Sequence, residues 1–66
     1  MKLTINGEAS SVADDVTLEV LLLDLTGTTR GSAAAVDGEV VPRGEWTTFR
    51  LREGQTIEVL TAVQGG

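Results

Sequence analysis

The two ends of the chain carry the clearest alternation of polar and apolar residues. Leu3 and Ile5 alternate with polar neighbours near the N-terminus, and residues 56–63 repeat this pattern near the C-terminus. A period of two places successive side chains on opposite faces of a strand. We therefore expect a strand in each segment. Because these two patterns are the strongest, we expect the two strands to pair side by side in the centre of a sheet.

The last of these strands has two distinct faces. One face carries Ile57, Val59, Thr61 and Val63, and the other carries Glu58, Leu60, Ala62 and Gln64. Ile57 and Val59 are expected in the hydrophobic core. Two interpretations of Leu60 and Ala62 stay open: either loops cover this second face, or the two side chains form a patch that docks a partner protein.

A helix is predicted between Thr17 and Leu25. Its apolar residues, Leu18, Leu21, Leu22 and Leu25, recur at the spacing of one helix face. Thr17 is a good N-cap, and Gly27 is placed to end the helix. We expect this face to join both strong strands in one core, formed by Ile5, Leu18, Leu21, Leu22, Ile57 and Val59.

Two dipeptides mark tight turns between further strands. Asn6-Gly7 predicts a hairpin that joins the first strand to residues 8–12. Asp37-Gly38 predicts a second hairpin, which joins a run of small residues at 33–36 to residues 40–41. The sheet should therefore contain short strands in addition to the two strong ones.

After these hairpins, Pro42 interrupts regular pairing because it has no backbone N–H to donate. The segment that follows reads as a turn, and its Trp46 is expected in the core or as a lid over it. Phe49 and Leu51 resume the alternation. The element order predicts an α+β protein with a β-grasp fold, in which a mixed sheet of four to five strands packs against one main helix.

Composition limits what this domain can do chemically. The chain has 66 residues, which is enough for one domain, and it contains no Cys and no His. It therefore has no thiolate nucleophile, no disulfide and no imidazole base. The net charge of −5, without a basic cluster, argues against nucleic acid binding. No apolar run is long enough for a membrane span, and the first residues read as a strand, so cytoplasmic residence is expected.

The chain ends in two glycines, Gly65 and Gly66. Two residues without Cβ form a terminus thin enough to enter a narrow active site, and they end in an ionised carboxylate. We expect residues 1–63 to form the folded domain and residues 64–66 to form a flexible tail. The competing interpretation is an ordinary frayed end.

Several motifs, in this order, resemble the ThiS family, the ubiquitin-like sulfur carriers of thiamine biosynthesis. Residues 3–8 read L-T-I-N-G-E, and residues 17–22 read T-L-E-V-L-L. Residues 40–46, V-V-P-R-G-E-W, are similar to the family's V-P-R-x-x-W segment. Residues 53–55, E-G-Q, precede the last strand and the diglycine. The resemblance covers essentially the whole chain.

The resemblance implies a carrier protein rather than an enzyme. In such families an E1-like adenylating enzyme of the ThiF type, using ATP and Mg²⁺, couples the C-terminal carboxylate to AMP. Sulfur then displaces AMP and leaves a thiocarboxylate, which a ThiG-type thiazole synthase consumes. On this basis Gly66 would carry sulfur, and Gln64 and Gly65 would form the tail. Leu60, Ala62 and Arg43 would contact partners. No catalytic or metal-binding residue and no bound cofactor are expected, and the free protein is expected to be a monomer.

Three alternatives remain at this stage. The chain could carry sulfur in another pathway, like the small subunit of molybdopterin synthase or a carrier for cysteine or siderophore synthesis. It could be a protein modifier, although Lys2 is its single lysine and lysine-linked chains are therefore improbable. It could also be an interaction module that uses an exposed sheet edge.

Overall fold

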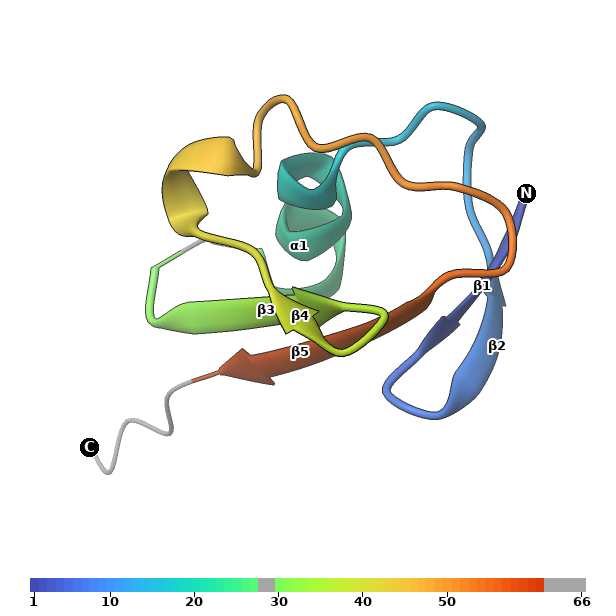
Figure 1. Cartoon of the computed structure of the whole chain (residues 1–66), viewed down its shortest axis with the longest axis horizontal. Coiled ribbons are helices and arrows are strands. Elements are labelled where there is room, and N and C mark those ends of the chain that lie inside the picture. Colours follow the sequence, from blue (N-terminus) through green and yellow to red (C-terminus); the bar gives the residue numbers. More distant parts are fainter. Residues whose placement is uncertain (28–29, 62–66) are drawn as a thin grey trace.

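The computed structural model describes residues 1–27 and 30–61, where a five-stranded sheet packs against one α-helix (Figure 1). The strands are β1 (Lys2–Ile5), β2 (Glu8–Ser11), β3 (Ser32–Val36), β4 (Glu39–Val40) and β5 (Thr56–Thr61). The α-helix is α1 (Leu18–Thr26), and a 3₁₀ turn, η1 (Arg43–Glu45), follows β4. This element order confirms the α+β prediction.

The two strong strands lie side by side in the middle of the sheet, as expected. The strand order is β2-β1-β5-β3-β4. β1 and β5 run parallel, with Ile5 paired to Ile57. β3 runs antiparallel to β5 over its whole length, from Ser32 opposite Thr61 to Val36 opposite Ile57. Each hairpin adds one edge strand to this central part of the sheet.

Both predicted hairpin turns are present, and both use left-handed backbone conformations. Asn6 and Gly7 have φ values of 50° and 85°, and Asp37 and Gly38 have 51° and 86°. Positive φ at both central residues defines the type I′ turn, whose twist matches that of the paired strands. The Asn-Gly and Asp-Gly dipeptides therefore direct the chain back on itself where the sequence indicates.

The helix begins and ends at the predicted capping residues. The Thr17 hydroxyl accepts a hydrogen bond from the Val20 N–H at 3.3 Å. Gly27 adopts φ of 80° and donates its N–H to the Leu23 carbonyl at 2.8 Å. Both interactions satisfy backbone groups that a helix end otherwise leaves without partners.

One core joins the helix to the sheet and contains every residue assigned to it from the sequence. Its buried side chains are Leu3, Ile5, Leu18, Leu21, Leu22, Ala34, Val36, Val41, Trp46, Leu51, Ile57 and Val59. Leu25 shares the predicted helix face but was not assigned to the core, and its side chain is 48% exposed. Leu25 lies at the helix end, where it lines a groove instead of packing against a continuous sheet.

The segment after β4 covers the core without forming a strand of the sheet. The renewed alternation at Phe49 and Leu51 yields one isolated bridge, between Thr17 and Arg50. Trp46 is buried, and its Nε1 donates to the Val41 carbonyl at 2.8 Å. The aromatic ring is therefore a core residue, as expected. Within the described part of the chain, no helix combines the length and apolar character needed to cross a bilayer.

Candidate functional site

The face of the sheet opposite the helix carries an exposed apolar surface. Val40 and Leu60 are 76% and 72% exposed, respectively, although both are large apolar side chains on strands. They line a shallow hollow of about 680 Å³, whose floor includes Ala33 and Ala35 of β3. Large exposed apolar groups that lie together mark contact surfaces more often than isolated ones do. We call this surface, formed by Val40, Leu60, Ala33 and Ala35, the outer patch.

The exposure of Leu60 does not fit the interpretation in which loops among the described residues cover this face. If loops covered this face, Leu60 would be buried, but no segment of residues 1–27 and 30–61 covers it. Glu58, which precedes it by two positions on β5, also lines the hollow. The outer patch therefore combines apolar side chains with a carboxylate at its border.

Arg43 lies apart from the outer patch and has a local contact of its own. Its guanidinium carbon sits 5.5 Å from the centre of the Trp46 ring, in cation–π geometry. Arg43 is absent from the residues that line the hollow. The structure therefore brings Leu60 together with Val40, which sequence reasoning did not include in the site, and does not bring Arg43 there.

The expected carrier residues Gln64, Gly65 and Gly66, together with Ala62, lie outside the described residues. The chain can be followed to Thr61, the last residue of β5. β5 is therefore the element that leads into the C-terminal segment (Figure 1). β1 pairs with the start of β5, and β3 pairs with it as far as Thr61, so β3 holds the position from which that segment departs.

Sequence reasoning missed a second role of the two hairpin turns. The Asn6 side-chain oxygen accepts from the Val59 N–H at 2.8 Å, and the Asp37 side-chain oxygen accepts from the Thr56 N–H at 2.9 Å. Each turn thus bonds to β5 as well as closing its hairpin. The presence of Asn and Asp in these turns could have indicated such bonds, because their short side chains can accept hydrogen bonds from backbone groups close in space.

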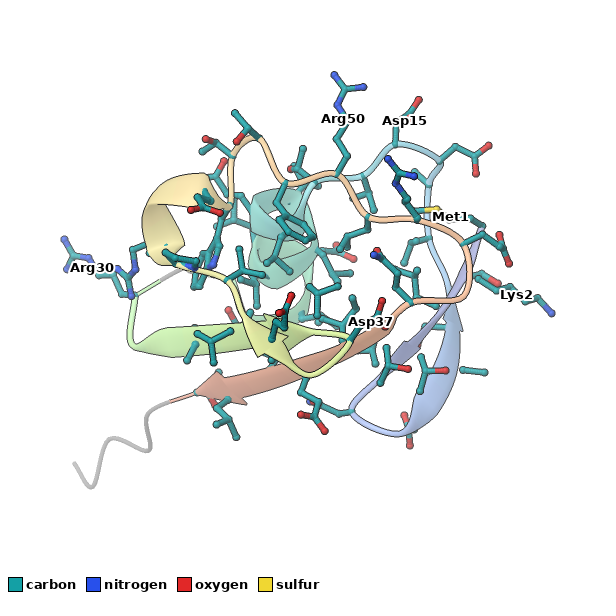
Figure 2. The ribbon with its side chains drawn as sticks, viewed as in Figure 1. Met1, Lys2, Asp15, Arg30, Asp37 and Arg50 are labelled. Carbon is teal, nitrogen blue, oxygen red and sulfur yellow. The ribbon has the colours of Figure 1, made fainter. Side chains whose placement is uncertain are left out.

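The charged side chains do not converge on a catalytic centre. Figure 2 shows Lys2, Asp15, Arg30 and Arg50 pointing outward at separate places on the surface. Among the described residues, no three carboxylates lie close enough together to hold a metal ion.

Comparison with solved structures defines the class of protein. The fold matches a crystal structure of the thiamine biosynthesis protein ThiS from Geobacter metallireducens, with a TM-score of 0.84, 29% identity and all of both chains covered. A solution structure of a thiamine biosynthesis protein from the same organism matches with a TM-score of 0.83 and 29% identity, over all of this chain and 88% of the other. These are ubiquitin-like β-grasp proteins, and the chain has their five-stranded sheet with one helix.

The sequence comparisons then identify the family. The ThiS family model matches residues 3–66, and the chain belongs to that family. It is 29% identical to the sulfur carrier protein ThiS of Escherichia coli over the full length of both. It is also 32% identical to a thiazole synthase of Paramagnetospirillum magneticum, spanning all of this chain but 20% of that protein. The chain is therefore a sulfur carrier of thiamine biosynthesis and not an enzyme.

Proposed function

We propose that the terminal carboxylate of Gly66 is the group that carries sulfur. A carboxylate is a poor electrophile, so it must first be activated. Its oxygen would attack the α-phosphorus of ATP, which releases pyrophosphate and forms an acyl-adenylate. Sulfur at the oxidation level of sulfide, as in hydrosulfide, would then attack the carbonyl carbon and expel AMP, which leaves a C-terminal thiocarboxylate.

Two observations about the chain support Gly66 as the carrier. The family match extends to residue 66 and so includes the diglycine. The chain also has no Cys, so it cannot hold sulfur as a persulfide. An acyl carbon is the chemical alternative, and Gly65 leaves that carbon unshielded by any side chain. The folded part would be residues 1–63, with residues 64–66 as the tail.

The proposed partners are an adenylating enzyme of the ThiF type and a thiazole synthase of the ThiG type. The adenylating enzyme would bind ATP and Mg²⁺, since the carrier needs only to present its tail. The match to a thiazole synthase five times longer than this chain supports the second partner, because a carrier-like segment there belongs to the same polypeptide. The carrier would work as a monomer in the cytoplasm, where ATP is available.

The outer patch is the surface we assign to partner docking. Leu60 and Val40 are its exposed apolar side chains, and Ala62 follows Leu60 at the strand period, on the same face by sequence. Burial of these side chains against a partner would give an apolar contact close to the tail. Arg43 remains a candidate contact, although its stacking on Trp46 gives it a structural role as well.

Truncation of the tail tests the proposal. Deletion of Gly66, and separately Gly65→Val, should leave the thermal unfolding curve unchanged, because both residues belong to the proposed tail. Both variants should fail in ATP–pyrophosphate exchange with the adenylating enzyme. Exchange at the wild-type rate by the truncated protein would contradict the assignment of Gly66.

A further inference from the structure

The end of β5 has a free sheet edge on one side. β1 pairs with β5 as far as Ile5 opposite Ile57 and then turns away at Asn6-Gly7. β3 continues along the other side of β5 to Thr61. Figure 1 shows β5 running past the β1–β2 turn, with β3 on one side. Among the described residues, no strand lies beside the last part of β5 on the β1 side.

The hydrogen-bond pattern identifies the backbone groups on this free edge. The Asp37 N–H donates to the Thr56 carbonyl, so the even-numbered residues of β5 direct their backbone groups toward β3. The Asn6 N–H donates to the Ile57 carbonyl, so the odd-numbered residues face β1. The Val59 carbonyl and the Thr61 N–H therefore point past the end of β1.

The Asn6 side chain makes the last hydrogen bond on the β1 side of β5. Its Oδ1 accepts a hydrogen bond from the Val59 N–H at 2.8 Å. If β1 were longer, a backbone carbonyl of β1 would accept this hydrogen bond instead. The carboxamide thus satisfies one more donor after the strand has turned away. The next backbone groups on this side of β5 are the Val59 carbonyl and the Thr61 N–H. Neither β1 nor the Asn6 side chain reaches them.

A groove lies beside this edge. It has a volume of about 330 Å³, and its lining comes from the central strands, the helix end and β2: Ile5, Asn6, Val59, Thr61, Leu25, Thr26, Glu8 and Ser10. The exposure of Leu25 is explained by this groove, since no strand of residues 1–27 and 30–61 fills the space beside the last helical turn. An added strand would place one side chain in this groove and the next on the face that carries Leu60.

The last three residues of β5 carry none of the usual protection against pairing, and the charged residue that lines the groove is Glu8 of β2. Natural sheets shield exposed edges with Lys, Pro or inward-pointing charge. Val59, Leu60 and Thr61 provide none of these. A strand end without Lys, Pro or charge of its own, next to the proposed carrier terminus, is more consistent with a pairing site than with an inert surface.

We infer that the free edge of β5 at Val59–Thr61 binds an extended segment of the thiazole synthase, which adds a strand to the carrier's sheet. The inference rests on the proposed function: a synthase that receives the tail must bring its backbone close to the residues that follow Thr61. The thiazole synthase is favoured over the adenylating enzyme because a thiazole synthase contains a segment similar to this entire chain.

Thr61→Pro tests this pairing, with Thr61→Val as its matched control. Proline removes the N–H that faces the free edge, while the β3 ladder, which uses even-numbered residues of β5, stays intact. Valine keeps the N–H and the approximate side-chain shape. We expect Thr61→Pro to bind thiazole synthase about two- to tenfold more weakly than Thr61→Val, the range expected for one hydrogen bond. Equal affinities of the two variants would overturn the inference.

ATP–pyrophosphate exchange separates this inference from the proposed function. Thr61→Pro should support exchange with the adenylating enzyme as Thr61→Val does, whereas deletion of Gly66 abolishes it. Wild-type amide exchange gives a second measurement that does not depend on the proline variant. Thiazole synthase should slow exchange of the Thr61 amide and leave that of Glu58, already paired with Ala35, nearly unchanged. An unprotected Thr61 amide, or protection by the adenylating enzyme alone, would contradict the assignment.

Discussion

Leu21 and Leu23 are two positions apart on the same helix and have opposite environments. Leu21 is 3% exposed in the core, whereas Leu23 is 44% exposed. The helical period predicts this difference, because two residues correspond to about 200° of rotation at 3.6 residues per turn. At this scale the sequence identified part of the core: every side chain assigned to it is buried, but the core also contains residues that were not assigned, namely Leu3, Ala34, Val36, Val41 and Leu51.

Leu21→Ala should therefore destabilise the domain strongly. Removing a buried leucine side chain leaves a cavity and costs about 2–5 kcal/mol, a large part of the stability of a domain this small. Leu23→Ala is the matched control and should cost less than about 1 kcal/mol. Urea denaturation measures both. Similar costs for the two variants would mean that the buried face is wrongly assigned.

Residue patterns were less informative for polar side chains that act over long sequence distances. Asn6 was assigned a turn, which is correct, but its bond to Val59 spans 53 positions. Nothing local in the sequence specifies which strand such a side chain meets. Leu25 illustrates the same limit, because helical periodicity gives the face of a residue but not whether the sheet extends far enough to cover it.

At the level of elements, the turns and β5 depend on one another. Each turn places a side-chain oxygen against β5. Asn6 of the β1–β2 turn accepts from the Val59 N–H, and Asp37 of the β3–β4 turn accepts from the Thr56 N–H. The parallel pairing of β1 with β5 is short, so these bonds add to the contacts that hold β5 in place. The strand carrying the tail is therefore fixed from both sides.

Asn6→Gly should weaken this fixation, whereas Asn6→Asp should preserve it. Glycine accepts the φ of 50° but removes the acceptor for the Val59 N–H, which should cost about 1 kcal/mol. Aspartate tolerates the same backbone conformation and keeps an acceptor oxygen. The free energy of unfolding from denaturant titration measures the difference. If the two variants are equally stable, the Asn6–Val59 bond contributes nothing.

Element order and pairing could be predicted because periodicity, capping and turn dipeptides agree along most of the chain. The segment from Phe49 to Leu51 was the exception. Its short alternation was noted without an assigned element; in the structure Leu51 is buried and Arg50 makes an isolated bridge with Thr17. Three residues of alternation do not distinguish a strand from an extended segment that covers a core.

At the scale of the whole molecule, apolar side chains are exposed on two sides. Val40 and Leu60 form part of the outer patch on the sheet, while Val20 and Leu23 lie on the outward face of the helix. We assign partner docking to the sheet side, because β5 leads from there into the C-terminal segment. The chain alone predicted Leu60 as a candidate, but only the fold placed Val40 beside it.

Leu60→Asp should therefore weaken docking, and Val20→Asp should not. Both side chains are more than half exposed, so neither substitution should unfold the domain. A charge in the outer patch would have to be desolvated in the complex, which should lower the affinity for the adenylating enzyme or the thiazole synthase. Titration of each variant with each partner measures this. An equal effect of the two substitutions would contradict the assignment of docking to the sheet.

The central claim, that sulfur travels on the carbonyl carbon of Gly66, is tested most directly by mass spectrometry. Protein isolated from its native cells should contain a fraction in which one oxygen is replaced by sulfur. Fragmentation should place that sulfur in the C-terminal peptide, and an alkylating reagent should trap it there. The variant lacking Gly66 should carry none. Sulfur located elsewhere in the chain, or present equally in the truncated variant, would contradict the account.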